Sequence, residues 1–307
     1  MNVDKAARPG AGEEHSPNVA YLLLTLMALF FAANHVIGRG VHEEIPPVGL
    51  SFWRWVTGAL ILAPFVLNRP GVISRVFGRH AGVMLLLGSM MVGSTTLILL
   101  ALNFTMAINV SVINAIQPGL TVLFAWMFLK EPLSSRQLLG VVAACVGVLV
   151  MLSRGHWATL VGLEMNGGDL IALLAMCGFA GYAVSLYRMP HELSFAESLF
   201  GIIVMGSLAL LPFYLIESLF FATVPLSLKT GGIVFTLALL VSVLGMLMWN
   251  FGNRRIGPNR AVVFINLIPV FGVILATAFL GETIHGFHVV GAVFIIVGIR
   301  LVVDKTT

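Results

Sequence analysis

Long apolar runs, separated by short polar segments, follow one another along almost the whole chain. A helix needs about 20 mostly apolar residues to cross a bilayer. Ten runs fit this requirement, at residues 18–38, 47–67, 81–102, 108–129, 136–153, 167–187, 195–215, 231–250, 257–280 and 286–303. The pattern therefore predicts an all-α integral membrane protein with ten transmembrane helices.

The composition supports this class. Of the 307 residues, 59% are hydrophobic and 10% are charged, whereas soluble domains carry about 25% charged residues. Cys145 and Cys177 lie inside apolar runs and in no CxxC or CxxH pattern. We therefore expect no metal site, cofactor or disulfide framework. In a membrane protein the net charge of +4 reports orientation, and we expect no nucleic-acid partner.

The distribution of lysine and arginine predicts the orientation, because basic residues gather in cytoplasmic loops. With the N-terminus inside, the outer segments carry only Arg39, Arg154 and Lys229. The inner segments then carry thirteen basic residues, namely Lys5, Arg8, Arg69, Arg75, Arg79, Lys130, Arg136, Arg188, Arg254, Arg255, Arg260, Arg300 and Lys305. We expect a multi-pass protein of the bacterial inner membrane with both termini in the cytoplasm.

The second half of the chain repeats the first at a spacing of 151 residues. Pro118, Glu131, Gly140 and Gly147 recur as Pro269, Glu282, Gly291 and Gly298. Spans four and five thus correspond to spans nine and ten. Since five spans are an odd number, the second copy enters the membrane from the opposite side, and such inverted repeats are common in secondary transporters.

This duplication predicts the organisation of the chain. We expect a disordered cytoplasmic tail at 1–17, a first five-helix unit at 18–153, a connector at 154–166, a second unit at 167–303 and a short tail at 304–307. The glycines of spans five and ten are expected to pack helices closely, inside one chain or between the two copies of a homodimer.

The repeated proline and glutamate lead to two expectations. Pro118 and Pro269 lie inside apolar runs, where a proline removes a backbone donor and bends a helix. The bends are expected to shape helix packing, to take part in gating, or both. Glu131 and Glu282 stand just before spans five and ten, so we expect each carboxylate to cap the start of the next helix, with a role in transport as the alternative.

Four segments carry a resemblance to a known family. They are PPVGLSFWRWVTGALILAP (46–64), the segment 118–152 that begins PGLTVLFAWMFLKEPL, GGDLIALLAMCGFAGYAVSLYR (167–188) and the segment 248–302. In these segments the sequence resembles EamA-type members of the drug/metabolite transporter superfamily. The resemblance implies two EamA units, ten helices and the export or exchange of small organic metabolites. It leaves the substrate open.

Polar residues inside a membrane are costly and usually face the bundle interior. Asn34 and His35 lie near the outer end of span one, and Arg54 lies inside span two. Two interpretations of Arg54 stay open: it binds a substrate carboxylate or phosphate, or it snorkels or pairs with Glu43 or Glu44. His35 is either a hydrogen-bonded packing residue or a proton carrier.

The remaining cavity candidates lie in spans three to nine: Thr95, Asn114, Gln117, Tyr182, Asn250 and Asn266. Asn114 and Gln117 share one helix face beside Pro118, and Asn266 lies near the corresponding place in span nine. Thr95 is also explained by packing within its own helix. Trp126 and Trp249 lie at inner ends of spans, where aromatic residues usually anchor in the headgroup region.

No aspartate or glutamate lies near the middle of a predicted span, which disfavours carboxylate-based proton coupling. No Walker, HExxH or GxSxG motif is present, so no enzyme activity is expected. The inverted repeat predicts a secondary transporter, and the family resemblance implies an exporter or exchanger of small metabolites such as amino acids. The alternatives are a broad drug-efflux carrier and, less well supported, a membrane-embedded enzyme or a passive channel.

Overall fold

A computed structural model describes residues 17–39, 44–105, 110, 113–131, 133–154, 156, 158, 166–280 and 283–303. Regular structure in these ranges is entirely helical. The first half contains α1 (Pro17–Arg39), α2 (Pro47–Val66), η1 (Ser74–Arg79), α3 (Ala81–Ala101), α5 (Gln117–Phe124), η2 (Ala125–Leu129) and α6 (Ser135–Leu152). The predicted tails, apart from Pro17, and most of the predicted connector lie outside the described residues.

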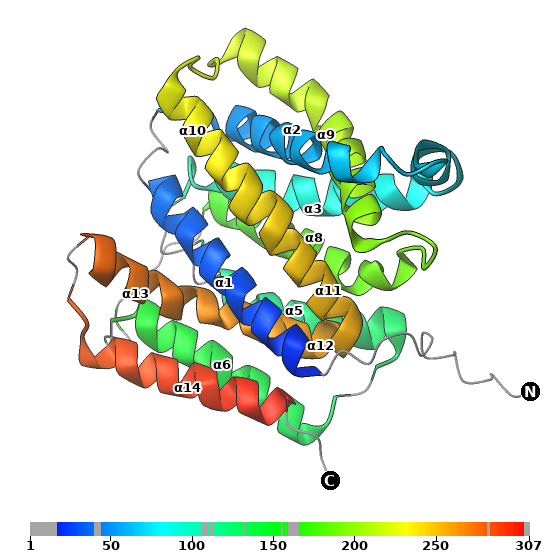
Figure 1. The fold of residues 1–307 in the computed structure, drawn as a ribbon. Coiled ribbons are helices and arrows are strands. Elements are labelled where there is room, and N and C mark those ends of the chain that lie inside the picture. Colours follow the sequence, from blue (N-terminus) through cyan, green and yellow to red (C-terminus); the bar gives the residue numbers. More distant parts are fainter. Residues whose placement is uncertain are drawn as a thin grey trace, which may run out of the picture.

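The second half forms spans six to ten. It contains α8 (Gly167–Ser185), η3 (Leu186–Arg188), α9 (Phe195–Phe220), α10 (Leu228–Leu237), η4 (Ala238–Gly245), α11 (Met246–Ile256), α12 (Pro258–Ala261), η5 (Val262–Asn266), α13 (Leu267–Leu280) and α14 (Gly286–Val303). Span eight is built from α10, η4 and α11 in sequence, and span nine from α12, η5 and α13 (Figure 1).

The prediction of an all-α membrane protein is confirmed. Within the described ranges, nine helical segments are long and apolar enough to cross a membrane. A shorter apolar helix, Gln117–Leu129, occupies the place of the fourth span. Span eight extends to Ile256, six residues beyond its predicted end at residue 250, because its polar last turns remain helical.

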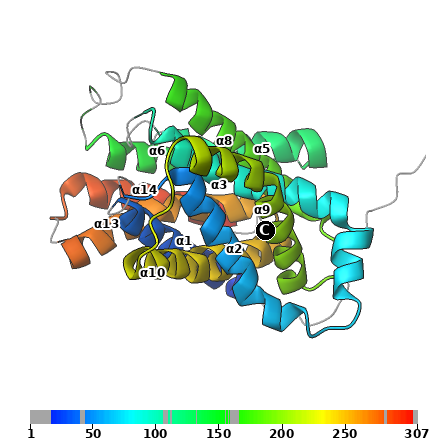
Figure 2. The same cartoon turned by 90° about the horizontal axis from the view of Figure 1, so that it is seen from above.

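The helix contacts show the duplication in three dimensions. The helix α2 packs against its counterpart α9, and α6 packs against its counterpart α14. Other contacts occur in equivalent pairs: α3 with α8 matches α11 with α1, and α5 with α8 matches α13 with α1. Figure 2 shows the bundle turned by 90°, with α2 crossing near α9 and α10. Each repeat therefore makes the same contacts with the other.

The crossing of α6 and α14 shows that the two copies run in opposite directions. A Cβ added to Gly140 would lie 2.7 Å from the carbonyl oxygen of Gly298, and one added to Gly147 would lie 2.6 Å from that of Gly291. The first glycine of the pair in α6, Gly140, thus meets the second glycine of the pair in α14, Gly298, and Gly147 meets Gly291. The two helices are therefore antiparallel. Because they correspond by the 151-residue spacing, the repeat is inverted.

Both repeated prolines follow an interruption of their helix. Pro118 lies in the first turn of α5, directly after a turn at Ala115 and Ile116. Pro269 lies in the first turn of α13, directly after the 3₁₀ segment η5. Proline cannot donate the hydrogen bond that would continue the preceding helix. The thiol of Cys145 donates to the Ala115 carbonyl oxygen at 3.2 Å, which satisfies an acceptor at this interruption.

Polar side chains join the two repeats at one end of the bundle. The Glu197 carboxylate lies 3.3 Å from Arg75 Nη2, and Glu192 lies 3.3 Å from Arg79 Nη1 and 2.7 Å from His80 Nε2. These contacts connect η1 and its flanks to the start of α9.

A second set of contacts joins the repeats at the other end. The Lys229 ammonium lies 2.7 Å from the Glu44 carboxylate. Glu217 of α9 accepts the backbone N–H groups of Val48 and Gly49 at 3.0 and 2.6 Å, so it caps α2 where the helix dipole favours an anion. Each end of the bundle is thus closed by contacts between the repeats.

Candidate functional site

Buried polar atoms without a partner are rare in native proteins, and each one needs an explanation, such as water or a ligand. Among the described residues, such atoms are spread over several elements, and they include groups on α2, around the interruptions of spans four and nine, and on α11.

Arg54 is the most unusual of these residues. It is 4% exposed in the middle of α2, and among the described residues its Nε and Nη2 atoms have no hydrogen-bond partner. The guanidinium lies 5.0 Å from the ring centroid of Trp55. Glu44, one of the two expected partners, binds Lys229 instead, and Glu43 lies outside the described residues. Arg54 therefore presents a buried positive charge with open donors.

The neighbours of Arg54 are held by hydrogen bonds to α3. Trp55 Nε1 donates to Thr95 Oγ1 at 3.2 Å, and Thr95 Oγ1 in turn donates to the Val92 carbonyl oxygen at 2.9 Å. The hydroxyls of Ser51 and Thr96 share a hydrogen bond of 2.7 Å. Thr95 thus positions the tryptophan beside Arg54.

A second polar stripe follows the interruption of span four. Asn114, Gln117 and Thr121 recur at helical spacing, and Gln117 and Thr121 are 5% and 0% exposed. In the described part of the chain, Asn114 Oδ1 and Thr121 Oγ1 have no partner. Asn266 in η5 is 3% exposed, and its Nδ2 atom likewise lacks a partner among those residues. Both interrupted helices therefore carry unsatisfied amides.

The third polar group lies on α11. Tyr182 of α8 donates its hydroxyl to Asn250 Oδ1 at 2.7 Å, with both residues 0% exposed. Asn253 is also fully buried. Neither of its amide atoms finds a partner in the described ranges, and the same holds for Asn250 Nδ2 and Trp249 Nε1. The expectation that Trp249 anchors in the headgroup region is wrong, since this side chain is only 2% exposed.

Glu131 does not cap α6, contrary to expectation. The cap is Ser134, whose side chain accepts from the backbone of Gln137 in a complete capping box. Glu131 instead accepts from Asn259 Nδ2 at 3.2 Å and hydrogen-bonds the Tyr187 side chain. Glu282, the corresponding residue of the second repeat, lies outside the described residues.

Glu131 therefore bridges the two repeats rather than capping a helix. Burial raises the pKa of its carboxyl above the ordinary value, while the Tyr187 hydrogen bond and the charge of Arg260 act in the opposite direction. The contact joins the end of span four to η3 and α12.

Of the remaining candidates, Asn34 is half-buried in α1. His35 belongs to the same helix, but its side chain lies outside the described residues. No group of three His, Cys, Asp or Glu side chains suited to a metal ion occurs within the described ranges.

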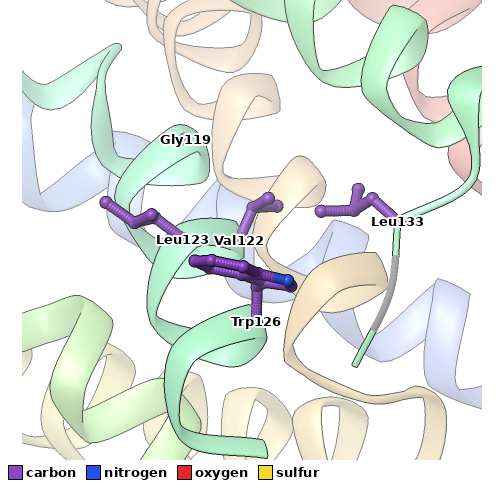
Figure 3. A pocket seen from close by; sticks show the side chains of 5 residues that line it. All are labelled: Gly119, Val122, Leu123, Trp126 and Leu133. Carbon is purple, nitrogen blue, oxygen red and sulfur yellow. The ribbon is translucent and has the colours of Figure 1, made fainter. Parts of the chain in front are cut away.

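None of these candidates lines a shallow hollow of about 410 Å³. Figure 3 shows its lining, which is Gly119, Val122, Leu123 and Trp126 of span four together with Leu133. Trp126 and Leu123 are 59% and 45% exposed, so the hollow opens on the outside of the bundle. Its lining is apolar, and we assign no binding role to it.

Comparison with known families is decisive for the class of protein. The model of the EamA-like transporter family matches residues 18–153 and again residues 166–304. The chain belongs to the EamA-like transporter family. The resemblance to the drug/metabolite transporter superfamily is thereby confirmed, and two EamA matches agree with the two repeats of the fold.

Curated relatives and a solved structure agree with this family. An uncharacterized transporter of Bacillus subtilis, YyaM, is 27% identical over 280 residues, which are 91% of this chain and 92% of the relative. A probable amino-acid metabolite efflux pump of Salmonella typhimurium is 27% identical and covers 92% of this chain and 93% of its own. A crystal structure with 17% identity has a TM-score of 0.78 over 94% of this chain and 97% of its own.

A third relative is named for one substrate. A probable terminal-alkyne amino-acid exporter of Streptantibioticus cattleyicolor is 26% identical over 205 residues, 64% of each chain. Membership of the EamA-like transporter family makes this protein a transporter.

The structure brings some sequence-predicted candidates together and adds others. Tyr182 and Asn250, which lie 68 residues apart in the chain, are hydrogen-bonded. Thr121 and Asn253 were missed. Their helical spacing from Gln117 and Asn250 was a usable signal, since residues three or four apart share a helix face.

Proposed function

We propose that this EamA-like transporter exports or exchanges small carboxylate-bearing metabolites of the amino-acid class. The observation that carries the proposal is Arg54, a buried guanidinium with unpartnered Nε and Nη2 atoms among the described residues. Arginine binds carboxylates through paired N–H donors, and such charge-assisted hydrogen bonds are the strong ones. The names of two relatives, an amino-acid metabolite efflux pump and an amino-acid exporter, agree with this substrate class.

The proposed mechanism is alternating access, in which the two repeats rock around a site near the membrane midplane. The interruptions before Pro118 and Pro269 supply hinges, since a few residues at element ends absorb the change in backbone angles. Asn114, Gln117 and Asn266 are proposed to line the cavity between these hinges. The contacts between repeats at the two ends of the bundle would break and form in turn.

We further propose that both termini lie in the cytoplasm of a bacterium and that the membrane is the inner membrane. The bias of thirteen basic residues against three supports the orientation. An even number of spans supports placing the two termini on one side.

The test is counterflow in proteoliposomes loaded with a mixed pool of amino acids and common metabolites. Saturable uptake of a few labelled carboxylate compounds is expected. Arg54→Gln should lower the rate at subsaturating substrate by about ten- to a hundredfold, because hydrogen bonds to charged groups contribute roughly 1.5–3 kcal/mol. The control is Arg188→Gln, which removes an exposed arginine and should leave uptake unchanged.

Other outcomes would discriminate between the rival functions. Uptake that ignores Arg54→Gln in a folded protein would refute the carboxylate site. Uptake of apolar cations alone would favour a drug-efflux carrier, and unsaturable flux would favour a channel. Uptake that requires a pH gradient would point to proton coupling, and His35 would then be the next residue to replace.

A further inference from the structure

The buried stripe of α11 carries polar groups that the Arg54 site does not use. Met246, Trp249, Asn250 and Asn253 recur at positions i, i+3, i+4 and i+7, so they share one face of the helix. All four are at most 2% exposed. Arg255, on the opposite face, is exposed. The stripe therefore points into the protein.

Four atoms on this stripe lack partners in the described part of the chain. Three are donors, namely Trp249 Nε1, Asn250 Nδ2 and Asn253 Nδ2, and one is an acceptor, Asn253 Oδ1. Burying polar groups without partners destabilises the folded state, and native proteins contain only a few such groups per hundred residues. Four within two turns of one helix indicate a place that is occupied by a ligand or water at some stage.

The stripe lies away from Arg54 along the membrane normal. Arg54 is seven residues after the start of α2 at Pro47, whereas Asn253 is three residues before the end of α11 at Ile256. At 1.5 Å per residue, these positions lie about 10 Å and about 5 Å from opposite faces of the bundle. Across a hydrocarbon core of about 30 Å, the two places are too far apart for one amino acid to touch both.

The elements beside α11 are the ones held by Glu131. The helix α11 contacts η3 and α12, and Tyr187 of η3 and Asn259 of α12 are the two hydrogen-bond partners of Glu131. In this structure the contact between repeats closes the end of the bundle next to the stripe. Separation of span four from η3 and α12 would open a route to it.

We propose that the α11 stripe is a second binding station for the transported solute, on the opposite side of the midplane from Arg54. Its excess of N–H donors selects groups that accept hydrogen bonds, such as a carboxylate or a sulfonate, and it carries no net charge. Because the station carries no full positive charge, it binds an anionic group more weakly than Arg54 does. The solute can therefore move on from Arg54 and still be released. The inference rests on the proposed transport of carboxylates, but its chemistry is testable separately.

The experiment uses Asn253→Cys in the full-length protein in detergent, where both ends are accessible. The probes are two thiol reagents of similar size, 2-sulfonatoethyl methanethiosulfonate and its trimethylammonium analogue. Modification is scored by mass spectrometry of the peptide that contains residue 253, so the native cysteines remain. Each rate is divided by the rate of the same reagent with free mercaptoethanol. The matched control is Met248→Cys, on the other face of the same helix.

Normalised modification at residue 253 should favour the sulfonate over the ammonium reagent by on the order of tenfold, with neither reagent reacting at residue 248. No modification at 253, equal modification by both reagents, or preference for the ammonium reagent would each overturn the proposal. If Asn253→Cys does not fold, Asn250→Cys on the same stripe carries the same expectation. A sulfonate preference combined with failed amino-acid counterflow would retain the station and reject only the proposed substrate class.

Discussion

The close crossing of α6 and α14 gives a direct test of how the two repeats pack together. In Gly147→Ala, the new Cβ would lie 2.6 Å from the Gly291 carbonyl oxygen and 2.9 Å from Ile295 Cγ1. Favourable contacts need about 3.5 Å, so the helices would have to separate by about 0.9 Å. The nearest atom belongs to the backbone and cannot rotate away. Overpacking of this kind costs about 1–3 kcal/mol, of which the better helix propensity of alanine offsets about 0.5–1 kcal/mol.

The assay is thermal unfolding of the purified protein in detergent. A net loss of about 0.5–2 kcal/mol should lower the Tm of Gly147→Ala by several degrees, using roughly 2–4 °C per kcal/mol for chains of 150–250 residues. The matched control is Gly93→Ala inside α3, where an added Cβ meets no atom within 4 Å. This control should melt at or above the wild-type temperature. A Gly147→Ala protein as stable as the control would refute the close crossing.

Two further predictions concern polar groups near the start of α6. Because burial raises the pKa of Glu131 above 4.5, its contribution to stability is full below that pH and is lost as the pH rises through the folded-state pKa. Glu131→Gln should flatten this decline in Tm between about pH 4 and pH 7. An unchanged slope would contradict a raised pKa for Glu131. Ser134→Ala should cost about 0.5–2 kcal/mol through loss of the helix cap, whereas Ser135→Ala, one residue later and also exposed, should change the Tm little.

Most of the fold was predictable because a bilayer leaves few alternatives. Backbone groups in lipid must be satisfied within each segment, so long apolar runs must be helices or closed barrels. The matched prolines and glycines then revealed the repeat. The prediction was weakest at the C-terminal end of span eight, where Asn250, Asn253, Arg254 and Arg255 lower the hydropathy. These residues remain helical because their helix packs against protein, which an average over the sequence does not detect.

The site was less predictable because a sequence does not show which face of a helix turns inward. The position of Trp249 near a span end predicts an interfacial anchor, but the side chain is buried. Glu131 precedes α6 closely enough to suggest a cap, yet it reaches Asn259, 128 residues later in the chain. Such long-range partners follow from helix packing, which the sequence pattern leaves open.

The two repeats share their scaffold, but Arg54 of the first repeat has no counterpart in the second. Gly58 and Pro64 of α2 recur 148 residues later as Gly206 and Pro212 of α9, and at that spacing Arg54 corresponds to Ile202. An inverted scaffold favours alternating access, because exchanging the conformations of the two repeats converts a state open on one side into a state open on the other. The two states then differ little in backbone packing. Arg54 breaks this symmetry, so if it binds the solute as proposed, binding and release are not equivalent at the two faces of the membrane.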